Sequence, residues 1–397
     1  MGLHLTNKQL FQLHIAQTSA YPMELEIEKA ENIYLVDTDG RKYIDLISGI
    51  AVSSLGHGNP KIVEAVQRQA AEHMHVMVYG EFVQSPQVKL AKAISDTLPD
   101  PLDNVFFVNS GSEAIEGAMK LAKRFTGRHE IVSCHNSYHG STQGALSLGS
   151  HEIFKQAFMP LLPGISHINF GDEKDLISIT EKTAAVIIET VQGEAGIRIA
   201  SKSYFKKLRE KCKETGALLI LDEIQTGFGR TGKFWGFEHY NIVPDIITSA
   251  KGMGGGMPIG AFISSKEIMS ALQTDPVLGH ISTFGGHPVS CAASAAILEE
   301  LTITKMYEQA DEKAQIFKRH LDHPKIKEIR HLGLMMAVEF DSFDLVSKII
   351  KKSMELGLIT DWFLFCDNAI RIAPPLIISE DQIIESCNIL NKAIDAL

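Results

Sequence analysis

The sequence predicts an α/β protein with a large domain on a mostly parallel, doubly wound sheet and a smaller α+β domain from both chain ends. Three observations predict this fold. Short apolar segments alternate with segments of helical period up to about residue 300, and the pattern then changes. The length of 397 residues also suits two domains. The predicted bounds are 1–48 for an N-terminal segment joining the small domain, 49–295 for the large domain and 296–397 for the small domain.

The expected strands of the large domain are short apolar segments, which are typical of strands buried on both faces of a parallel sheet. They lie at residues 105–108, 184–188, 217–221, 246–248 and 261–264. Between them, apolar residues recur with helical spacing near 62–70 and 115–122, and a third helix is expected over 201–216. The second helix is expected to end at Gly127 after Lys123 and Arg124, residue types that helix C-termini favour.

The small domain is expected to combine strands at 328–331 and 335–340 with two helices. One helix ends at Gly357, and another begins at Ser379, which has Gln382 at the spacing of a capping box. The N-terminal segment near 25–46 contains an Asp39-Gly40 pair, which favours a hairpin turn. Both chain ends are therefore expected to contribute to this domain.

Composition and charge exclude several function classes. The chain has 38 basic and 48 acidic side chains, and this formal charge of −10 argues against binding to nucleic-acid phosphates. Its five cysteines are scattered without a CxxC pair, so reduced thiols in the cytoplasm are expected rather than a disulfide framework. No apolar run is long enough to span a membrane. A cytoplasmic protein without nucleic-acid or membrane partners is therefore expected.

The first candidate site is Asn109-Ser110-Gly111-Ser112-Glu113, between an expected strand and an expected helix. Ser110 and Glu113 have the spacing of a capping box, and Gly111 allows the backbone to approach a ligand closely. Unpaired N–H groups at a helix start suit a phosphate group. Taken alone, however, the motif favours a well-capped structural helix without a ligand.

The second candidate site is Asp222, which follows the apolar segment 218–221 and precedes Gln225. Acidic residues at the carboxyl end of a central strand lie where α/β folds bind ligands, although Asp222 alone also fits a turn cap. The glycines of Gly227-x-Gly229-x-x-Gly232 match a dinucleotide-binding fingerprint, which would indicate a nicotinamide-dependent oxidoreductase. Pro244 follows too soon for the helix and strand that this fingerprint requires, so the match is interpreted as accidental.

The third candidate site is Lys251, which follows an apolar segment and enters the glycine-rich run 252–256. Most lysines are solvated, but apolar and small residues surround this one, so we expect burial to lower its pKa. Only the neutral amine is nucleophilic, as a lysine that condenses with carbonyl groups requires. The small residues also leave room for a flat cofactor near the backbone.

These motifs resemble class III pyridoxal-phosphate-dependent aminotransferases, the family of acetylornithine, ornithine and 4-aminobutyrate aminotransferases. The resemblance covers nearly the whole chain: GIAVSSLGHGNP at 49–60, NSGSEA at 109–114, YHG at 138–140, ETVQGEAG at 189–196, DEIQTGFGRTG at 222–232, AKGMGGGMPIGA at 250–261, STFGGHP at 282–288 and RIAPPL at 371–376. It implies fold type I of the pyridoxal-phosphate-dependent transferases, with pyridoxal 5′-phosphate (PLP) as cofactor. Ile50, where ornithine enzymes tend to carry tyrosine, and the short length favour the acetylornithine branch.

The resemblance implies a role for each residue around the cofactor. Lys251 would carry PLP on its amine and shuttle a proton, while Asp222 would keep the pyridine nitrogen protonated. Tyr138 would stack on the ring, and Gln225 would lie near the phenolic oxygen. Thr283 would reach the phosphate from the neighbouring subunit of a homodimer. The complete implied set is Ser110, Gly111, Ser112, Tyr138, His139, Asp222, Gln225, Lys251 and Thr283.

The resemblance also implies the substrate-binding residues. Arg371 is similar to the arginine that clamps the carboxylate of a 2-oxo acid, and Glu194 to the gate that pairs with it while an ω-amine donor passes. Ser282, Ser141 and Ile50 are expected to line the pocket. The implied reaction is a ping-pong transfer of an amino group to 2-oxoglutarate from an ω-amino donor of the acetylornithine, ornithine or 4-aminobutyrate type.

Several alternatives stay open at this point. The acetylornithine and ornithine enzymes usually carry arginine after the aromatic-x-Gly motif to bind the donor's α-carboxylate, whereas this chain has Ser141. Either the donor lacks that carboxylate or another residue binds it. An aminomutase, racemase or decarboxylase of the same family, and a non-catalytic binding protein on the same scaffold, are rival functions. No metal site is expected, because the His135/His139 pair lacks a third ligand.

Overall fold

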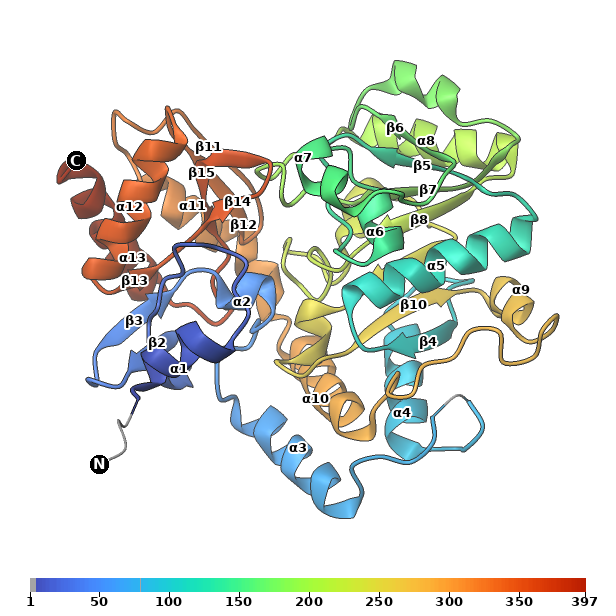
Figure 1. The fold of residues 1–397 in the computed structure, drawn as a ribbon, viewed down its shortest axis with the longest axis horizontal. Helices are drawn as coiled ribbons and strands as arrows, with labels where there is room; N and C mark the ends of the chain where they lie inside the picture. The colour runs from blue at the N-terminus through green and yellow to red at the C-terminus, as the bar shows by residue number, and fades with distance from the viewer. Residues whose placement is uncertain (1–4, 79) are drawn as a thin grey trace.

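The computed structural model describes residues 5–78 and 80–397, so the first four residues of the predicted N-terminal segment lie outside it (Figure 1). The α-helices are α1 (Asn7–His14), α2 (Ser48–Ala51), α3 (Pro60–Glu72), α4 (Ser85–Ser95), α5 (Gly111–Thr126), α6 (Gln143–Ser147), α7 (Glu152–Lys155), α8 (Lys202–Thr215), α9 (Lys266–Met269), α10 (Pro288–Thr304), α11 (Ala310–His320), α12 (Phe343–Glu355) and α13 (Glu380–Asp395). The strands are β1 (Ile27–Glu31), β2 (Tyr34–Asp37), β3 (Lys42–Asp45), β4 (Asn104–Val108), β5 (Glu130–Cys134), β6 (Ile165–Ile168), β7 (Thr183–Glu189), β8 (Leu218–Asp222), β9 (Ile246–Ser249), β10 (Gly260–Ser264), β11 (Glu328–Leu332), β12 (Met335–Glu339), β13 (Leu358–Ile359), β14 (Trp362–Phe363) and β15 (Cys366–Ile372).

The central sheet has the strand order β4-β10-β9-β8-β7-β5-β6. It contains a strand at each of the five expected positions, together with β5 and β6, which were not predicted. Strands β6, β5, β7, β8 and β9 pair in parallel. The expectation of a parallel strand at 261–264 is wrong, because β10 pairs antiparallel with both β9 and β4. It follows β9 through residues 250–259 without a crossover helix, and such a connection returns the chain antiparallel.

Helices cover both faces of this sheet, as the doubly wound prediction requires. Ala185 and Ile187 of β7 belong to the apolar cluster that contains the buried side of α5. Their neighbours Val186 and Ile188 belong to the cluster that contains the buried side of α8. Successive side chains of a strand point to opposite faces, so α5 and α8 lie on opposite sides of the sheet. Continuous apolar strands are the consequence of this double burial.

The ends of the predicted helices follow local sequence signals, with one exception. Ser110 caps α5 by accepting a hydrogen bond from the Glu113 N–H at 3.2 Å. The Glu113 carboxylate, however, accepts from the backbone N–H of Asn109 at 2.7 Å, so the predicted capping box is not closed on Ser110. At the C-terminus of α5, Gly127 adopts the left-handed conformation, and Ser379 forms the expected reciprocal capping box of α13.

The N- and C-terminal parts of the chain build one lobe together, seen as blue and red segments side by side in Figure 1. Strand β13 pairs in parallel with β3, which extends the β1-β2-β3 sheet, and the Asp39-Gly40 pair lies in the turn between β2 and β3. A second sheet of order β11-β12-β15-β14 packs beside it. The predicted bound at 295/296 falls inside the continuous helix α10, and the domain bounds remain a prediction.

Across residues 5–78 and 80–397, no helix combines the length and apolar character needed to cross a bilayer.

We predict that Gly117→Ala lowers the free energy of unfolding by about 1–2 kcal/mol, although alanine is the better helix former. A Cβ at Gly117 of α5 would lie 2.7 Å from Cδ1 of Phe262, a fully buried ring on β10. Urea unfolding of the single variants and of Gly117→Ala/Phe262→Leu measures this effect. The smaller leucine should relieve the clash, so additive losses in the double variant would contradict it.

Candidate active site

The candidate active site is a cavity of about 420 Å³ at the carboxyl ends of the central parallel strands. In-register pairing places Glu189 of β7 beside Asp222 of β8, and Asp222 beside Thr248 of β9. The sequence-predicted residues that line this cavity are Ser110, Gly111, Ser112, Tyr138, His139, Glu194, Asp222, Gln225 and Lys251. Segments distant in the sequence therefore meet at one edge of the sheet.

Lys251 enters the cavity wall from the start of a short 3₁₀ turn, Lys251–Gly254, that follows β9. Its backbone has φ of 47°, a left-handed conformation that is uncommon for residues other than glycine. Burial lowers the pKa of the Lys251 amine, although nearby Glu194 opposes this shift. A lowered pKa increases the fraction of neutral amine, which is the nucleophilic form.

Asp222 is held in a fixed orientation at the carboxyl end of β8. Its Oδ2 lies 2.7 Å from Nδ1 of the buried His139, and its Oδ1 accepts the Ile224 N–H at 3.0 Å. Burial disfavours the imidazolium form of His139, but the hydrogen bond and charge of Asp222, together with the charge of Glu189, outweigh burial and raise the pKa of the ring. His139 thereby orients the Asp222 carboxylate at the cavity wall and compensates its negative charge.

Glu189 is a site residue that the sequence reasoning missed. Its carboxylate accepts the backbone N–H groups of Tyr138 at 3.0 Å and Gly193 at 2.9 Å. Burial, together with the nearby carboxylate of Asp222, raises the pKa of Glu189 to about 7, against the effect of His139. An acidic residue ending an apolar strand was the signal used for Asp222, and it would have found Glu189 as well.

The start of α5 provides unpaired backbone donors at the cavity wall. The N–H groups of Gly111 and Ser112 occupy the first two helical positions, which have no intrahelical acceptor. A Cβ at Gly140, whose φ is 127°, would lie 2.9 Å from the Cβ of Ser112, so this approach requires glycine. The donors and the small residues fit the phosphate of PLP, and Lys251 and Asp222 fit its aldehyde and ring nitrogen.

Arg371 of β15 and Glu194 form a buried bidentate ion pair. Nη1 and Nη2 of Arg371 contact Oε1 and Oε2 of Glu194 at 2.9 and 3.0 Å, and Nε contacts Asp361 at 2.9 Å. Burial opposes ionisation of both partners, yet their attraction prevails and lowers the pKa of Glu194. A substrate carboxylate reaches the paired edge of Arg371 only by displacing Glu194.

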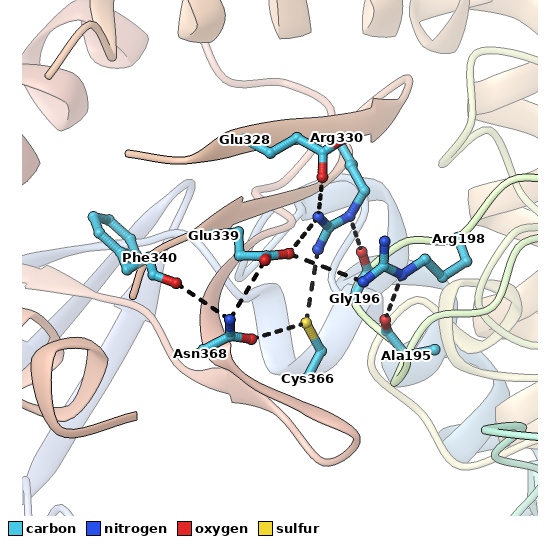
Figure 2. A network of polar contacts seen from close by, with 9 residues as sticks. All are labelled: Ala195, Gly196, Arg198, Glu328, Arg330, Glu339, Phe340, Cys366 and Asn368. Carbon is cyan, nitrogen blue, oxygen red and sulfur yellow. Dashed lines mark hydrogen bonds and ion pairs between the residues drawn. The ribbon is translucent and has the colours of Figure 1, made fainter. Parts of the chain in front are cut away.

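A second polar network fixes the loop that carries Glu194 (Figure 2). Nε of Arg330 on β11 donates to the Gly196 carbonyl at 2.7 Å, and its guanidinium also pairs with Glu339 of β12. Arg198, at the end of the same loop, donates to the Ala195 carbonyl at 3.2 Å. The small-domain sheet thereby holds both members of the Arg371–Glu194 pair.

The remaining predicted residues lie outside this cavity. The Ser282 hydroxyl accepts from Asn109 Nδ2 at 2.9 Å and lines a separate cavity beside β4. Thr283 and Ile50 are exposed. Ser141 lies next to the site, with its hydroxyl 3.2 Å from the Tyr138 hydroxyl, and lines an adjoining cavity.

Two other sequence motifs lack the surroundings that their alternative functions require. The glycines of 227–232 lie in consecutive turns rather than at the start of an α-helix, so they lack the context of a dinucleotide-binding loop. In the described ranges, no group of three or more His, Cys, Asp or Glu side chains could hold a metal ion. His139 is instead bound to Asp222.

Comparisons with known proteins show the family to which the chain belongs. A family model described as aminotransferase class-III matches residues 15–394. Acetylornithine aminotransferase of Caldanaerobacter subterraneus is 40% identical, with 95% of this chain and 96% of the relative covered. A [LysW]-aminoadipate semialdehyde/glutamate semialdehyde transaminase of Sulfurisphaera tokodaii is 36% identical, with 93% and 95% covered.

Solved structures show the same fold. An ornithine aminotransferase from Toxoplasma gondii, solved with partial occupancy of PLP at its active site, has a TM-score of 0.90 and 29% identity, over 98% of this chain and 95% of that one. A transaminase from the marine bacterium Virgibacillus has a TM-score of 0.91 and 27% identity, over 98% and 97%. The chain therefore belongs to the PLP-dependent aminotransferase class-III family and is a transaminase with fold type I.

Proposed function

We propose that this transaminase moves an amino group from an ω-amino donor, of the acetylornithine, ornithine or 4-aminobutyrate type, to 2-oxoglutarate by a ping-pong mechanism. The observation that carries the proposal is the Arg371–Glu194 pair beside the cavity that holds Lys251. An arginine paired with a glutamate can serve two substrates in turn: one whose reacting carbon carries a carboxylate and one whose reacting carbon carries none. Similarity to acetylornithine aminotransferases supports the donor type.

The proposed roles of Lys251 and Asp222 follow from their positions. PLP, when bound, supplies an aldehyde that condenses with primary amines and a pyridine ring that takes up electron density from the reacting carbon. Lys251, whose amine has a lowered pKa, would hold the cofactor through its neutral amine, and Nζ would take and return the proton of the substrate carbon. The Asp222 carboxylate, oriented by His139, holds a proton on the ring nitrogen.

The other cavity residues bind and orient the cofactor in this proposal. The Gly111 and Ser112 N–H groups would bind its phosphate, the half-buried Tyr138 would pack against its ring, and Gln225 would contact its phenolic oxygen. Gln225 Oε1 packs so closely on Gly193 that a side chain there would overlap it. The packing restrains the amide of Gln225 beside Lys251.

We also propose a cytoplasmic homodimer with an active site shared across the interface. The exposed Thr283, outside the cavity of its own chain, is proposed to complete the phosphate site of the neighbouring subunit, with Ser282 and Ile50 near the substrate entrance. The cytoplasmic location is supported by the five cysteines, which are all free thiols.

A donor panel tests the proposed reaction. Acetylornithine, ornithine, 4-aminobutyrate, lysine and simple diamines are each supplied with 2-oxoglutarate, and glutamate formation is measured. Initial rates at several donor and acceptor concentrations should give the parallel reciprocal plots of a ping-pong mechanism. Intersecting plots, or glutamate formation with none of the donors, would overturn the proposal.

We expect Lys251→Ala to reduce turnover by at least about 100-fold, because the attacking amine and the proton carrier are both lost. Peptide mass spectrometry after borohydride reduction should locate a cofactor adduct on residue 251 of the unaltered enzyme and none in the variant. Lys233→Ala, which removes an exposed lysine from the preceding glycine-rich turn, is the control and should keep both adduct and turnover. An adduct at another lysine of the unaltered enzyme would refute the assignment.

Glu194→Gln should raise kcat/KM for 2-oxoglutarate relative to the ω-amino donor by about tenfold, the equivalent of roughly 1.4 kcal/mol. The glutamine no longer competes as an anion for the Arg371 guanidinium. Single-turnover measurement of each half-reaction gives the ratio. Asp361→Asn is the matched control, since it removes the carboxylate on Nε and leaves the Glu194 contact in place. An equal gain in both variants would argue against gating by Glu194.

A further inference from the structure

A second cavity, of about 560 Å³, adjoins the candidate active site. The two cavities share Tyr138, His139 and Gly140, and Ser141 lies in the wall of the second one. Its far side is formed by Leu364 and Phe365 in the hairpin between β14 and β15. This cavity therefore extends away from the proposed position of the PLP ring and leaves room for a long substrate.

The same hairpin links the second cavity to the carboxylate gate. The Leu364 N–H donates to Glu194 Oε2 at 3.0 Å, and the Phe365 N–H donates to the Glu194 carbonyl at 3.0 Å. Glu194 thus contacts both Arg371 and the wall of the second cavity. A substrate that enters between Tyr138 and this hairpin therefore passes both the Arg371–Glu194 pair and the second cavity.

Lys155, the last residue of α7, contributes a largely buried lysine side chain to this otherwise mostly apolar wall. It is only 9% exposed, and it is the one lysine or arginine among the described residues that line the cavity. None of the ion pairs formed within residues 5–78 and 80–397 involves Lys155. Lysines are rarely buried without an anionic partner, so the position favours an anion in the cavity.

His151 adds an unpartnered polar atom to the same wall. Its ring stacks on Phe365 with centroids 4.2 Å apart, and its buried Nε2 has no hydrogen-bond partner in the described chain. Burial lowers the pKa of His151, which leaves the ring neutral and able to donate one hydrogen bond. Ser141, whose hydroxyl contacts Tyr138, supplies no charge.

We propose that Lys155, assisted by His151, binds a carboxylate at the end of the donor remote from its reacting amine. This inference rests on the proposed function and deepens it: the donor is an ω-amino acid or its N-acylated form rather than a simple diamine. The cation that the acetylornithine and ornithine enzymes usually carry directly after the aromatic-x-Gly motif is supplied here from α7, in the wall of the cavity that Ser141 also lines.

The test compares two donors that differ only in the carboxylate, N-acetylornithine and N-acetylputrescine. Lys155→Met, which keeps the side-chain length and removes the charge, should lower kcat/KM for N-acetylornithine about 10- to 100-fold. The value for N-acetylputrescine should change less than about threefold. Lys182→Met, which removes an exposed lysine, is the control and should change neither. Equal losses with both donors, or no loss with N-acetylornithine, would overturn the role of Lys155.

A rescue experiment separates charge recognition from a packing role. Ser141→Arg in the Lys155→Met background returns a cation to the cavity wall and should recover at least about tenfold of the lost kcat/KM for N-acetylornithine. No recovery would mean that the loss arose from packing, which contradicts the proposal.

A binding measurement distinguishes failure of this inference from failure of the proposed function. Calorimetric titration of the pyridoxamine-phosphate form, which does not condense with amines, reports donor binding without turnover. Lys155→Met should weaken binding of N-acetylornithine at least about tenfold and leave N-acetylputrescine unchanged. If neither donor is transaminated, the proposed reaction fails for this donor type, and this titration alone decides the role of Lys155. Equal affinity of the unaltered enzyme and the Lys155→Met variant for N-acetylornithine would overturn the proposed role of Lys155.

Discussion

The in-register pairing of β7, β8 and β9 is the constraint on which the site depends. It sets Glu189, Asp222 and Thr248 side by side, and Lys251 follows β9 after a single intervening residue. A slip of one residue in β8 would turn the Asp222 side chain to the opposite face of the sheet. Such a slip is opposed because both faces of these strands are packed by helices, so core packing and catalytic geometry are enforced together.

The site also concentrates charge where solvent does not screen it. Glu189 and Asp222 are neighbouring buried carboxylates, and ionising both is unfavourable unless protons or cations compensate them. His139 compensates Asp222 directly, whereas Glu189 has its pKa raised to about 7 and so binds a proton readily near neutral pH. The cavity thereby keeps one oriented carboxylate opposite Lys251. The left-handed backbone of Lys251 costs about 1–3 kcal/mol, which the packed surroundings must offset.

How much of this arrangement the sequence predicts depends on the range of the interaction. The apolar strands, the Ser110 cap and the position of Lys251 follow from residues close together in the chain, and they were predicted. The direction of β10 depends on how β9 and β4 are placed, so the local apolar pattern did not reveal it. The Asp222–His139 and Arg371–Glu194 contacts join residues 83 and 177 positions apart. No local period encodes such contacts. The place of Asp222 at a strand end indicated that residue, whereas only the resemblance to a family indicated roles for His139, Glu194 and Arg371.

The residues proposed for the reaction and those proposed for substrate binding lie in different parts of this fold. Sequence motifs therefore identify the reaction better than they identify the substrate. Lys251 and Asp222 are tied to central strands, where a change of position would disturb the core of the sheet. Lys155 lies on α7, a helix of one turn outside the central sheet, and Ser141 lies in a loop. A cation at position 155 in place of one at position 141 leaves the packing of the central sheet unaltered. It still provides a positive charge in the cavity that attracts a carboxylate. The residue directly after an aromatic-x-Gly motif is therefore a poor guide to donor chemistry unless the whole cavity wall is considered.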